Sequence, residues 1–207
     1  TTATAPREYV EGLFDNYAAK FESSLVGNLE YKMPKMIVET ILKNNPRGKL
    51  GSILDLGCGT GLTGLEIKKY CTNLEGIDLS KRMLNEARKK NAYDRLTYRD
   101  IVDYLLTESL HFDYFISTDV FIYVGDLSNV FKLIKSNNSS GGKLVFSTEH
   151  TDKDEFYLEK SGRYSHSKTY IKSLCEKFNY TLAHFEIVNL RKEKGGYLAG
   201  GLYLLDF

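Results

Sequence analysis

An acidic residue followed by closely spaced glycines forms the stretch of this chain best suited to bind a ligand. Asp55 lies near the end of an apolar run, and the glycines follow it directly, as Gly57, Gly59 and Gly61. Glycines let the backbone approach a ligand and adopt positive φ. The apolar pattern from Leu62 onward predicts a helix whose N-terminus faces that ligand. The stretch therefore predicts a buried strand, a tight turn and a helix around a small-molecule site.

The details of this turn favour a cationic adenosine ligand over a dinucleotide. A dinucleotide fingerprint has its third glycine where this chain has Leu62. The Asp55 carboxylate would repel a pyrophosphate. Residues 57–67 contain no Lys or Arg that could balance the charge of a phosphate. A carboxylate here suits a ligand with an ammonium and a sulfonium and no phosphate, which describes S-adenosylmethionine.

Two further acidic residues end short predicted strands. Asp78 lies close to the offset of about 20 residues at which an acidic residue binds a ribose diol, although an Asp at a helix start is the alternative interpretation. Ser80 can cap the helix that follows. Asp100 ends the next predicted strand, residues 95–99, in the same way.

The run Leu54–Gly61 resembles motif I of the class I S-adenosylmethionine-dependent methyltransferases, and the two acidic motifs follow in the order of that family. The resemblance implies that Asp100 accepts a hydrogen bond from the adenine amino group and that the Ile101 amide meets the ring. A helix cap is the alternative role for Asp100.

The fourth predicted strand, residues 112–117, ends beside the same ligand crevice. The residues after it, Thr118 and Asp119, resemble the stretch that lines the methionine and adenine pockets of the family, and an ordinary helix start is the alternative for Asp119. Tyr123 is expected to contact the cofactor or the acceptor. The helix predicted over residues 7–22 carries an aromatic stripe that either closes over the cofactor through Tyr17, with a cation–π contact, or simply packs.

The predicted cofactor-binding residues are Tyr17, Asp55, Gly57, Cys58, Gly59, Gly61, Asp78, Leu79, Asp100, Ile101, Thr118, Asp119 and Tyr123.

The elements that position these residues alternate along the chain, which indicates a parallel sheet with helices on both faces. We expect strands near residues 52–56, 74–78, 95–99, 112–117, 142–149, 180–190 and 197–207. Helices are expected over 7–22, 34–43, 62–70, 81–91, 126–137 and 168–178. The last two strands form an antiparallel hairpin. The expected fold is α/β, a Rossmann-like methyltransferase fold with a seven-stranded, mostly parallel sheet.

The chain is expected to form one structural domain, with an N-terminal linker and helical cap over residues 1–44 and the core over residues 45–207. Residues 9–22, 29–34 and 162–167 are also similar to predicted methyltransferases often joined to tetratricopeptide repeats. That narrower resemblance implies a fused or partner repeat domain. The chain begins at Thr1, so a processed protein or an excised domain is expected.

Composition excludes several other classes of function. The formal net charge is +1 over 207 residues, which argues against nucleic-acid binding. Apolar runs are too short for a membrane span, and no secretory segment is evident. The three cysteines have neither metal nor redox spacing, so no metal is expected, and they indicate a reducing, cytoplasmic compartment. The oligomeric state is not predicted.

The residues that follow the fifth predicted strand are candidates for chemistry on the acceptor. His150 and His166 could each act as a general base, and Arg163, Tyr164 and Arg191 could bind the substrate. We therefore expect a methyltransferase for a small-molecule or metabolite acceptor, with transfer to oxygen. The alternatives are a cofactor-binding module, a protein methyltransferase that works with a partner, and an NAD(P)-dependent oxidoreductase.

Overall fold

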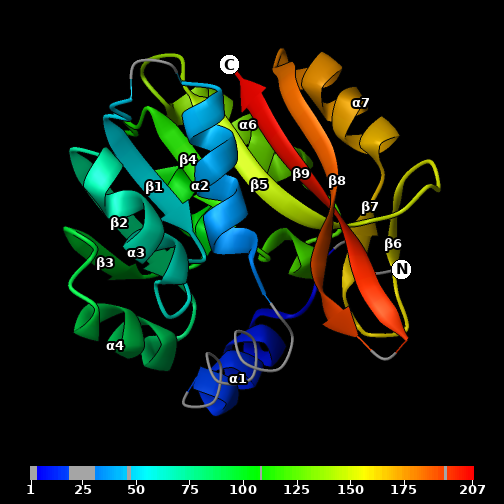
Figure 1. The fold of residues 1–207 in the computed structure, drawn as a ribbon, viewed down its shortest axis with the longest axis horizontal. Coiled ribbons are helices and arrows are strands. Elements are labelled where there is room, and N and C mark those ends of the chain that lie inside the picture. Colours follow the sequence, from blue (N-terminus) through cyan, green and yellow to red (C-terminus); the bar gives the residue numbers. More distant parts are fainter. Residues whose placement is uncertain (1–3, 19–30, 46–47, 108, 194) are drawn as a thin grey trace.

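One twisted sheet forms the centre of the molecule, and the computed structural model describes it through residues 4–18, 31–45, 48–107, 109–193 and 195–207, without the side chain of Tyr17. The strand order is β3-β2-β1-β4-β5-β7-β6, with β9 paired to β5 and β8 paired to β9 (Figure 1). The strands are β1 (Ser52–Leu56), β2 (Asn73–Asp78), β3 (Arg95–Tyr98), β4 (Tyr114–Ser117), β5 (Lys143–His150), β6 (Phe156–Leu158), β7 (Tyr164–His166), β8 (Thr181–Glu193) and β9 (Gly196–Asp206).

Strands β1 to β5 are parallel to one another, and β9 is antiparallel to both of its neighbours. Because the strand order reverses between β1 and β4, the carboxyl ends of these two strands flank the crevice in which open α/β sheets bind ligands. The predicted α/β fold, with a mostly parallel sheet that ends in an antiparallel hairpin, is confirmed.

Helices pack on both faces of the sheet because each has one apolar face. The α-helices are α1 (Arg7–Tyr17), α2 (Met33–Lys43), α3 (Leu62–Ile67), α4 (Lys81–Lys89), α5 (Ile101–Thr107), α6 (Ser128–Asn137) and α7 (Lys168–Phe178). Two core clusters show the division of the faces. One joins α2 and α3 to the sheet through residues such as Ile37 and Ile67, and the other joins α5, α6 and α7 through residues such as Phe131 and Leu174.

Several elements differ from the sequence expectations. The seven expected strands are present, and β6 and β7 are added within the segment expected as a loop. Helix α5 and the 3-10 turn Phe121–Tyr123 follow β3 and β4 where no helix was expected. The first helix ends at Tyr17, and residues 19–22 of the expected helix lie outside the described residues.

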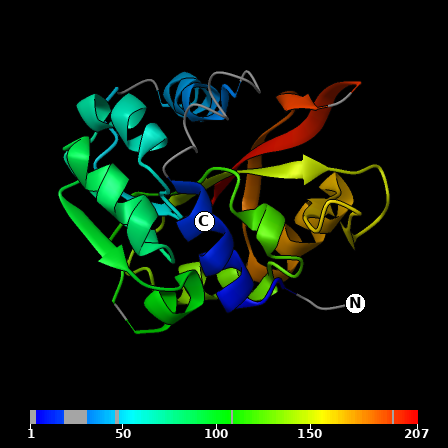
Figure 2. The same ribbon diagram turned by 90° about the horizontal axis from the view of Figure 1, so that it is seen from below.

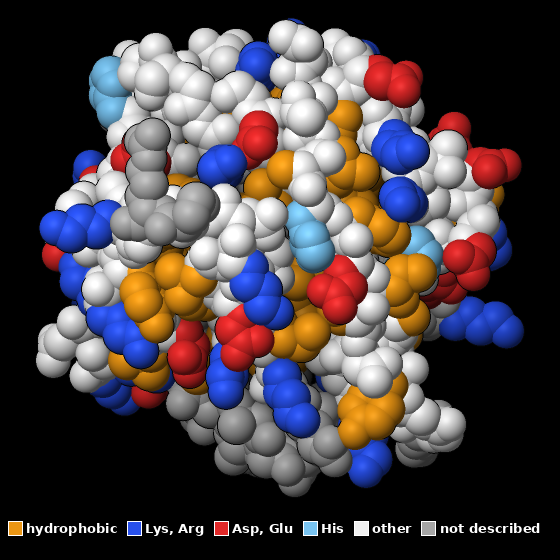
Figure 3. Space-filling view, turned by 45° about the horizontal axis from the view of Figure 1, so that its top comes forward, with side chains coloured by type: hydrophobic (Ala, Val, Ile, Leu, Met, Phe, Trp, Pro, Cys, Tyr) orange, Lys and Arg blue, Asp and Glu red, His pale blue; other side chains and the backbone are white. Residues whose placement is uncertain are grey.

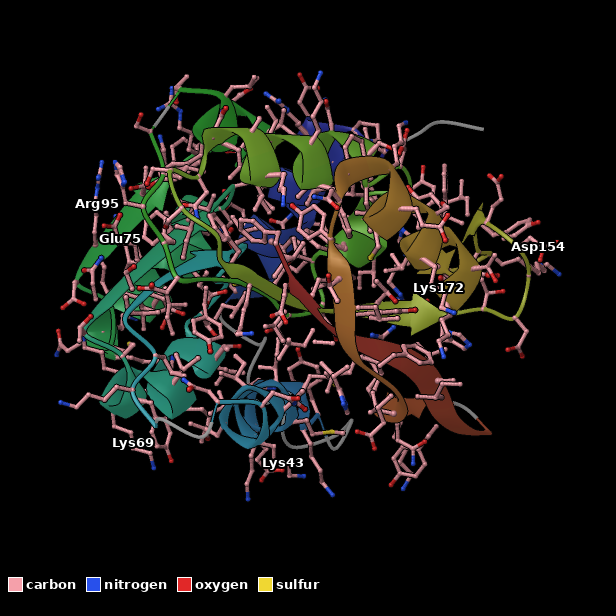
Figure 4. All side chains as sticks on the ribbon, turned by 90° about the horizontal axis from the view of Figure 1, so that it is seen from above. Lys43, Lys69, Glu75, Arg95, Asp154 and Lys172 are labelled. Carbon is pink, nitrogen blue, oxygen red and sulfur yellow. The ribbon has the colours of Figure 1, made fainter. Side chains whose placement is uncertain are left out.

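The surface carries mixed charge, in agreement with the net charge of +1. Lys and Arg side chains are interspersed with Asp and Glu side chains over the face drawn in Figure 3. At the far end of the sheet, Glu75 of β2 and Arg95 of β3 lie side by side (Figure 4), with 3.8 Å between Oε2 and Nη1. Across the residues described here, no helix is both long and apolar enough to pass through a bilayer.

Candidate functional site

A cavity of about 760 Å³ lies at the carboxyl ends of the parallel strands, and residues of α1 form part of its lining. The ribbon shows α1 beside the strands at this side of the sheet (Figure 2). This is the position where open α/β sheets bind ligands, and the volume is in the range of small-molecule sites. The predicted site residues that line it are Gly57, Gly59, Asp78, Leu79, Asp100, Ile101, Thr118, Asp119, Tyr123, Arg163 and Arg191.

The glycine turn after β1 has the backbone that its sequence predicts. Gly57, Gly59 and Gly61 all have positive φ, at 76°, 53° and 86°. A side chain on Gly57 would also meet Val120, because an ideal Cβ there would lie 2.5 Å from Val120 Cγ2. The turn therefore needs glycine both for its conformation and for its close packing against the end of β4. Gly61 precedes α3 behind the turn, and Cys58 is buried, so neither lines the cavity.

Asp78 joins the end of β2 to this turn. Gly59 N–H donates to Asp78 Oδ2 at 2.8 Å, and Ser80 N–H donates to Oδ1 at 2.8 Å. Burial raises the pKa of the Asp78 carboxyl to about 6, against the lowering effect of these backbone hydrogen bonds. A cavity-lining carboxylate with a fixed orientation is suited to the two vicinal hydroxyls of a ribose, which is the role predicted for it.

Asp55 lies behind the glycine turn and does not line the cavity. It is 1% exposed, and the Tyr93 hydroxyl donates to its Oδ2 at 2.6 Å. Burial raises the pKa of Asp55 to about 7, while the Tyr93 hydrogen bond lowers it and the charge of Asp78 raises it. Because Asp55 does not line the cavity, its carboxylate can act on a bound ligand only through its electrostatic field, from behind the turn.

Asp100 fits both interpretations that its sequence position allows. Its Oδ1 accepts from Val102 N–H at 2.9 Å and from Asp103 N–H at 3.2 Å, so it caps α5. It also lines the cavity next to Ile101. Arg7 of α1 donates to the same Oδ1 from Nη2 at 3.0 Å.

Helix α1 is tied to three sides of the cavity. Arg7 pairs with Asp100 and Asp103, and Asp15 accepts a hydrogen bond from the Ser80 hydroxyl. On the third side, the rings of Phe14 and Tyr123 meet edge to face with centroids 5.3 Å apart. Because Arg7, Val10, Glu11, Leu13 and Phe14 all line the cavity, the helix covers the site that the strand ends create. Tyr17 belongs to this helix, but its side chain lies outside the described residues.

The other end of the cavity contains a buried network of charges. Arg163 and Arg191 line the cavity, and both bond the same Oε1 atom of Glu149, which is 3% exposed. Arg191 also approaches Asp119, with 3.7 Å between Nη1 and Oδ2. The network ties β5, β8 and the segment before β7 to the end of β4, and it places polar groups of both signs at this end.

The two histidines predicted as candidate general bases are not among the residues that line the cavity. His166 is fully buried, and its Nε2 donates to the carbonyls of Gly125 and Val124 at 2.9 and 3.0 Å. Burial lowers the pKa of His166 to about 4. His150 Nε2 lies 3.3 Å from Asp152 Oδ1, beyond the cavity. Tyr164 packs its ring over Gly125 and likewise does not line the cavity.

Sequence reasoning missed several residues that line the cavity. Tyr31, Ser80, Met83, Arg99 and Val102 are among them. Ser80 and Val102 lie within two residues of the predicted Asp78 and Asp100, so proximity to these acids was a usable signal. Tyr31 had no local signal, because only the packing of the segment before α2 brings it to the site. Within the described ranges, no cluster of His, Cys, Asp or Glu could hold a metal ion.

Comparisons with known proteins point to one family. A family model described as "Methyltransferase domain" matches residues 48–198. An uncharacterized protein of Haemophilus influenzae is 34% identical over 54% of this chain and 47% of its own length. A carboxy-S-adenosyl-L-methionine synthase of Campylobacter fetus is 31% identical over 66% of this chain and 62% of its own length. The chain thus spans less than two thirds of the length of these curated relatives.

Solved structures share the fold at low sequence identity. An S-adenosylmethionine-dependent methyltransferase from Clostridium acetobutylicum is 21% identical, with a TM-score of 0.67 over 93% of this chain and 98% of that one. The magnesium protoporphyrin IX methyltransferase of Synechocystis PCC 6803, solved with bound SAM, is 15% identical, with a TM-score of 0.68 over 100% of this chain and 99% of that one. These likenesses agree with the cavity at the carboxyl ends of the strands.

Proposed function

The chain belongs to the methyltransferase domain family, and from this premise we propose that it transfers a methyl group from S-adenosylmethionine to the oxygen of a small-molecule acceptor. The predicted enzyme type, a class I S-adenosylmethionine-dependent methyltransferase with that cofactor, agrees with the family and the fold. The observation that carries the proposal is the arrangement around Asp78. One carboxylate both orients the glycine turn through Gly59 and lines the cavity beside it.

The cavity fits the chemistry of this cofactor. Asp78 and Asp100 at neighbouring strand ends offer acceptors for ribose hydroxyls and an adenine amino group. Gly57 and Gly59 line the cavity and carry no side chain, so a ligand can approach the backbone of the turn closely. Asp55 adds negative charge behind the turn. When bound, the cofactor would supply an electrophilic methyl group, and these residues would hold and orient it.

The acceptor end supports a small, polar molecule. This end is lined by Arg163, Arg191, Asp119, Tyr31 and Tyr123, and Glu149 pairs with the two arginines. The mixture of opposite charges is close to balance, so it favours neither a strongly anionic nor a strongly cationic acceptor. Residues of helix α1, among them Val10 and Phe14, line the cavity and narrow the access to it. This lining therefore supports a small acceptor without a large net charge, and a hydroxyl oxygen is the acceptor atom that we propose.

Ligand binding tests the proposal directly. We expect isothermal titration calorimetry to detect S-adenosylmethionine and its demethylated product at micromolar concentrations, and to detect no binding of NAD. The reason is that the carboxylates of Asp55 and Asp78 lie beside the glycine turn, where they favour a cationic ligand and disfavour a pyrophosphate. Micromolar NAD binding without binding of S-adenosylmethionine would overturn the assignment in favour of an oxidoreductase.

The two remaining alternatives are a cofactor-binding module, which would not transfer the methyl group, and a protein methyltransferase, which would transfer it to a protein. A methyl-transfer screen with labelled cofactor against metabolite pools separates an enzyme from a cofactor-binding module, because the module would bind cofactor and label nothing. Labelling of protein in cell extract would instead support a protein methyltransferase. For location we propose the reducing cytoplasm, since Cys58, Cys71 and Cys175 are all free thiols.

A further inference from the structure

Asp119 has an unusual backbone conformation at the end of β4. Its φ is +57°, in the left-handed region, which L-residues other than Asn, Asp and Gly rarely adopt. The two other described residues of this kind, Asn91 and Asn179, both follow helices, where such a conformation is common. At the end of a strand, this conformation fixes the direction in which the Asp119 side chain leaves the backbone, and the residue lines the cavity.

Neighbouring residues hold the Asp119 carboxylate in one orientation. The Ser147 hydroxyl accepts from Asp119 N–H and donates to Asp119 Oδ1, both at 2.9 Å. The Tyr31 hydroxyl also bonds the carboxyl group. The other carboxylate oxygen, Oδ2, lies 3.7 Å from Nη1 of Arg191, which also lines the cavity.

The position of Asp119 lies between the two ends of the cavity. On one side, its neighbour Val120 packs against Gly57 of the glycine turn, and the hydroxyl of Thr118 lies 3.2 Å from that of Thr63 at the start of α3. On the other side are Tyr31, Tyr123 and Arg191 at the acceptor end. The β1–β4 switch point thus places Asp119 where the methionine part of a cofactor would meet an acceptor.

Resting on the proposed function, we infer that Asp119 is a catalytic residue whose carboxylate faces the methyl-bearing sulfonium and receives the proton of an acceptor hydroxyl. In the reaction, the acceptor oxygen forms a bond to the methyl carbon, and the sulfur–carbon bond breaks. The sulfur keeps that electron pair and becomes neutral, and the hydroxyl proton passes to the Asp119 carboxylate and then to water. The carboxylate would favour the charged cofactor over the neutral product, and this difference would assist product release.

The charged and titratable groups around Asp119 agree with this role. Burial raises the pKa of its carboxyl to about 6, and Arg191 and Ser147 act in the lowering direction. Glu149 of β5 raises it and Tyr31 lowers it. Tyr123 and Arg163 complete the groups that line this end of the cavity. A carboxylate that is mostly ionised at neutral pH and gains a proton near pH 6 suits a proton acceptor.

The test compares the affinities of S-adenosylmethionine and its demethylated product, which differ in the methyl group and the sulfonium charge. Calorimetry from pH 5 to 8 gives the ratio of the two dissociation constants. Both ligands share the ribose that Asp78 is proposed to bind, so titration of Asp78 largely cancels in the ratio. The charge of Asp55 acts on the sulfonium in wild type and in Asp119 variants alike, so a comparison with a variant isolates the contribution of Asp119. We expect the preference for S-adenosylmethionine to grow about tenfold as the pH rises through 6, because a nearby opposite charge gains that much.

Asp119→Asn is the decisive variant, since Asn has the same shape and also tolerates left-handed φ. It should weaken the pH dependence relative to wild type and lower the affinity for S-adenosylmethionine about tenfold, with the product affinity unchanged. Glu193→Gln is the matched control, because it removes a charge from the same network outside the cavity lining. It should keep the wild-type ratio.

Two results would overturn the inference while leaving the proposed function intact. One is an unchanged ratio and pH dependence in Asp119→Asn, which would place the carboxylate away from the sulfonium. The other is an equal loss of both ligands in this variant, which would make Asp119 a structural residue. If wild-type protein bound neither ligand, the proposed function itself would fail.

Discussion

Among the single residues of the site, two carboxylates with similar sequence settings have different surroundings. Asp78 and Asp55 each lie at the end of a buried strand, and burial raises the pKa of both. Asp78 faces the cavity and bonds backbone amides, whereas Asp55 lies behind the turn and bonds the Tyr93 hydroxyl. We therefore expect substitution of the two to affect different properties of the protein.

Replacement of Asp78 by Ala should weaken binding of the demethylated cofactor by about 1.5–3 kcal/mol, the range for hydrogen bonds to charged groups. Some stability should also be lost, because Gly59 N–H loses its acceptor. Calorimetry and denaturant unfolding measure the two effects. Asp94→Ala is the control, since Asp94 also accepts from a backbone amide, that of Leu74, but does not line the cavity. Unchanged affinity in Asp78→Ala, with reduced stability, would make the residue a structural cap only.

Replacement of Asp55 by Asn should stabilise the ligand-free protein more at pH 7.5 than at pH 5. The pKa of Asp55 is raised to about 7 in the folded protein, so the folded state binds the proton more tightly than the unfolded state does. That contribution to the free energy of unfolding is present at low pH and is lost as the pH rises towards 7. The stability difference between variant and wild type should grow by about 1–3 kcal/mol across this range. Urea unfolding at the two pH values measures it, and a pH-independent difference would contradict it.

The chemistry of the glycine turn could be predicted from its residue types because backbone conformation depends on local sequence. Gly57 and Gly59 have the positive φ that their spacing predicts. The surroundings of Asp55 and His166 could not be predicted in this way. Their partners, Tyr93 and the carbonyls of Val124 and Gly125, are about 40 residues away in the chain and come close only when the sheet forms.

At the scale of secondary-structure elements, α1 is the feature most directly tied to ligand binding. It contacts Asp100, which is proposed to bind adenine, and Ser80, which lies two residues after the proposed ribose ligand Asp78. Hydrogen exchange in residues 7–17 should therefore slow when the demethylated cofactor is added, since ligand contact suppresses local opening. Mass spectrometry of exchanged peptides measures this change. Equal exchange with and without ligand would indicate passive packing.

Two variants separate the contributions to this closure. Arg7 is 55% exposed in its side chain, and exposed ion pairs contribute at most about 1 kcal/mol, so Arg7→Ala should change ligand affinity by less than about fivefold. Phe14→Ala should have the larger effect, because it removes the ring that meets Tyr123 at the cavity. A greater loss in Arg7→Ala than in Phe14→Ala would contradict this ranking.

The longer elements could be predicted from sequence because apolar periodicity over eight or more residues is a strong signal. Helix α7, with 11 residues, begins and ends where the pattern predicts. Strand β1 has only five residues, and its end could be predicted because the glycine turn follows it directly. Strands β6 and β7 have three residues each, which is too short for a period to be recognised. They exist because β7 pairs with the end of β5 and β6 then pairs with β7, and only the tertiary structure supplies those partners.

For the whole molecule, binding of cofactor should appear as thermal stabilisation. A ligand at 100 times its dissociation constant adds about 2.7 kcal/mol to the free energy of unfolding, which for a chain of this size raises Tm by roughly 5–10 °C. Differential scanning fluorimetry should detect this shift with the demethylated cofactor and none with NAD at equal concentration. A shift of similar size with NAD would count against the proposed function.

The position of β9 has a consequence for how the molecule assembles. Although β9 follows β8 in the chain, it lies between β5 and β8, pairing with β5 over residues 200–206 and with β8 along nearly its whole length. Strand β8 therefore has no place in the sheet until β9 has docked on β5, more than 50 residues earlier in the chain. Such long-range pairing slows folding. During synthesis, Arg191 and its partners can meet only after the hairpin closes, so the acceptor end of the site would be the last part of the protein to form.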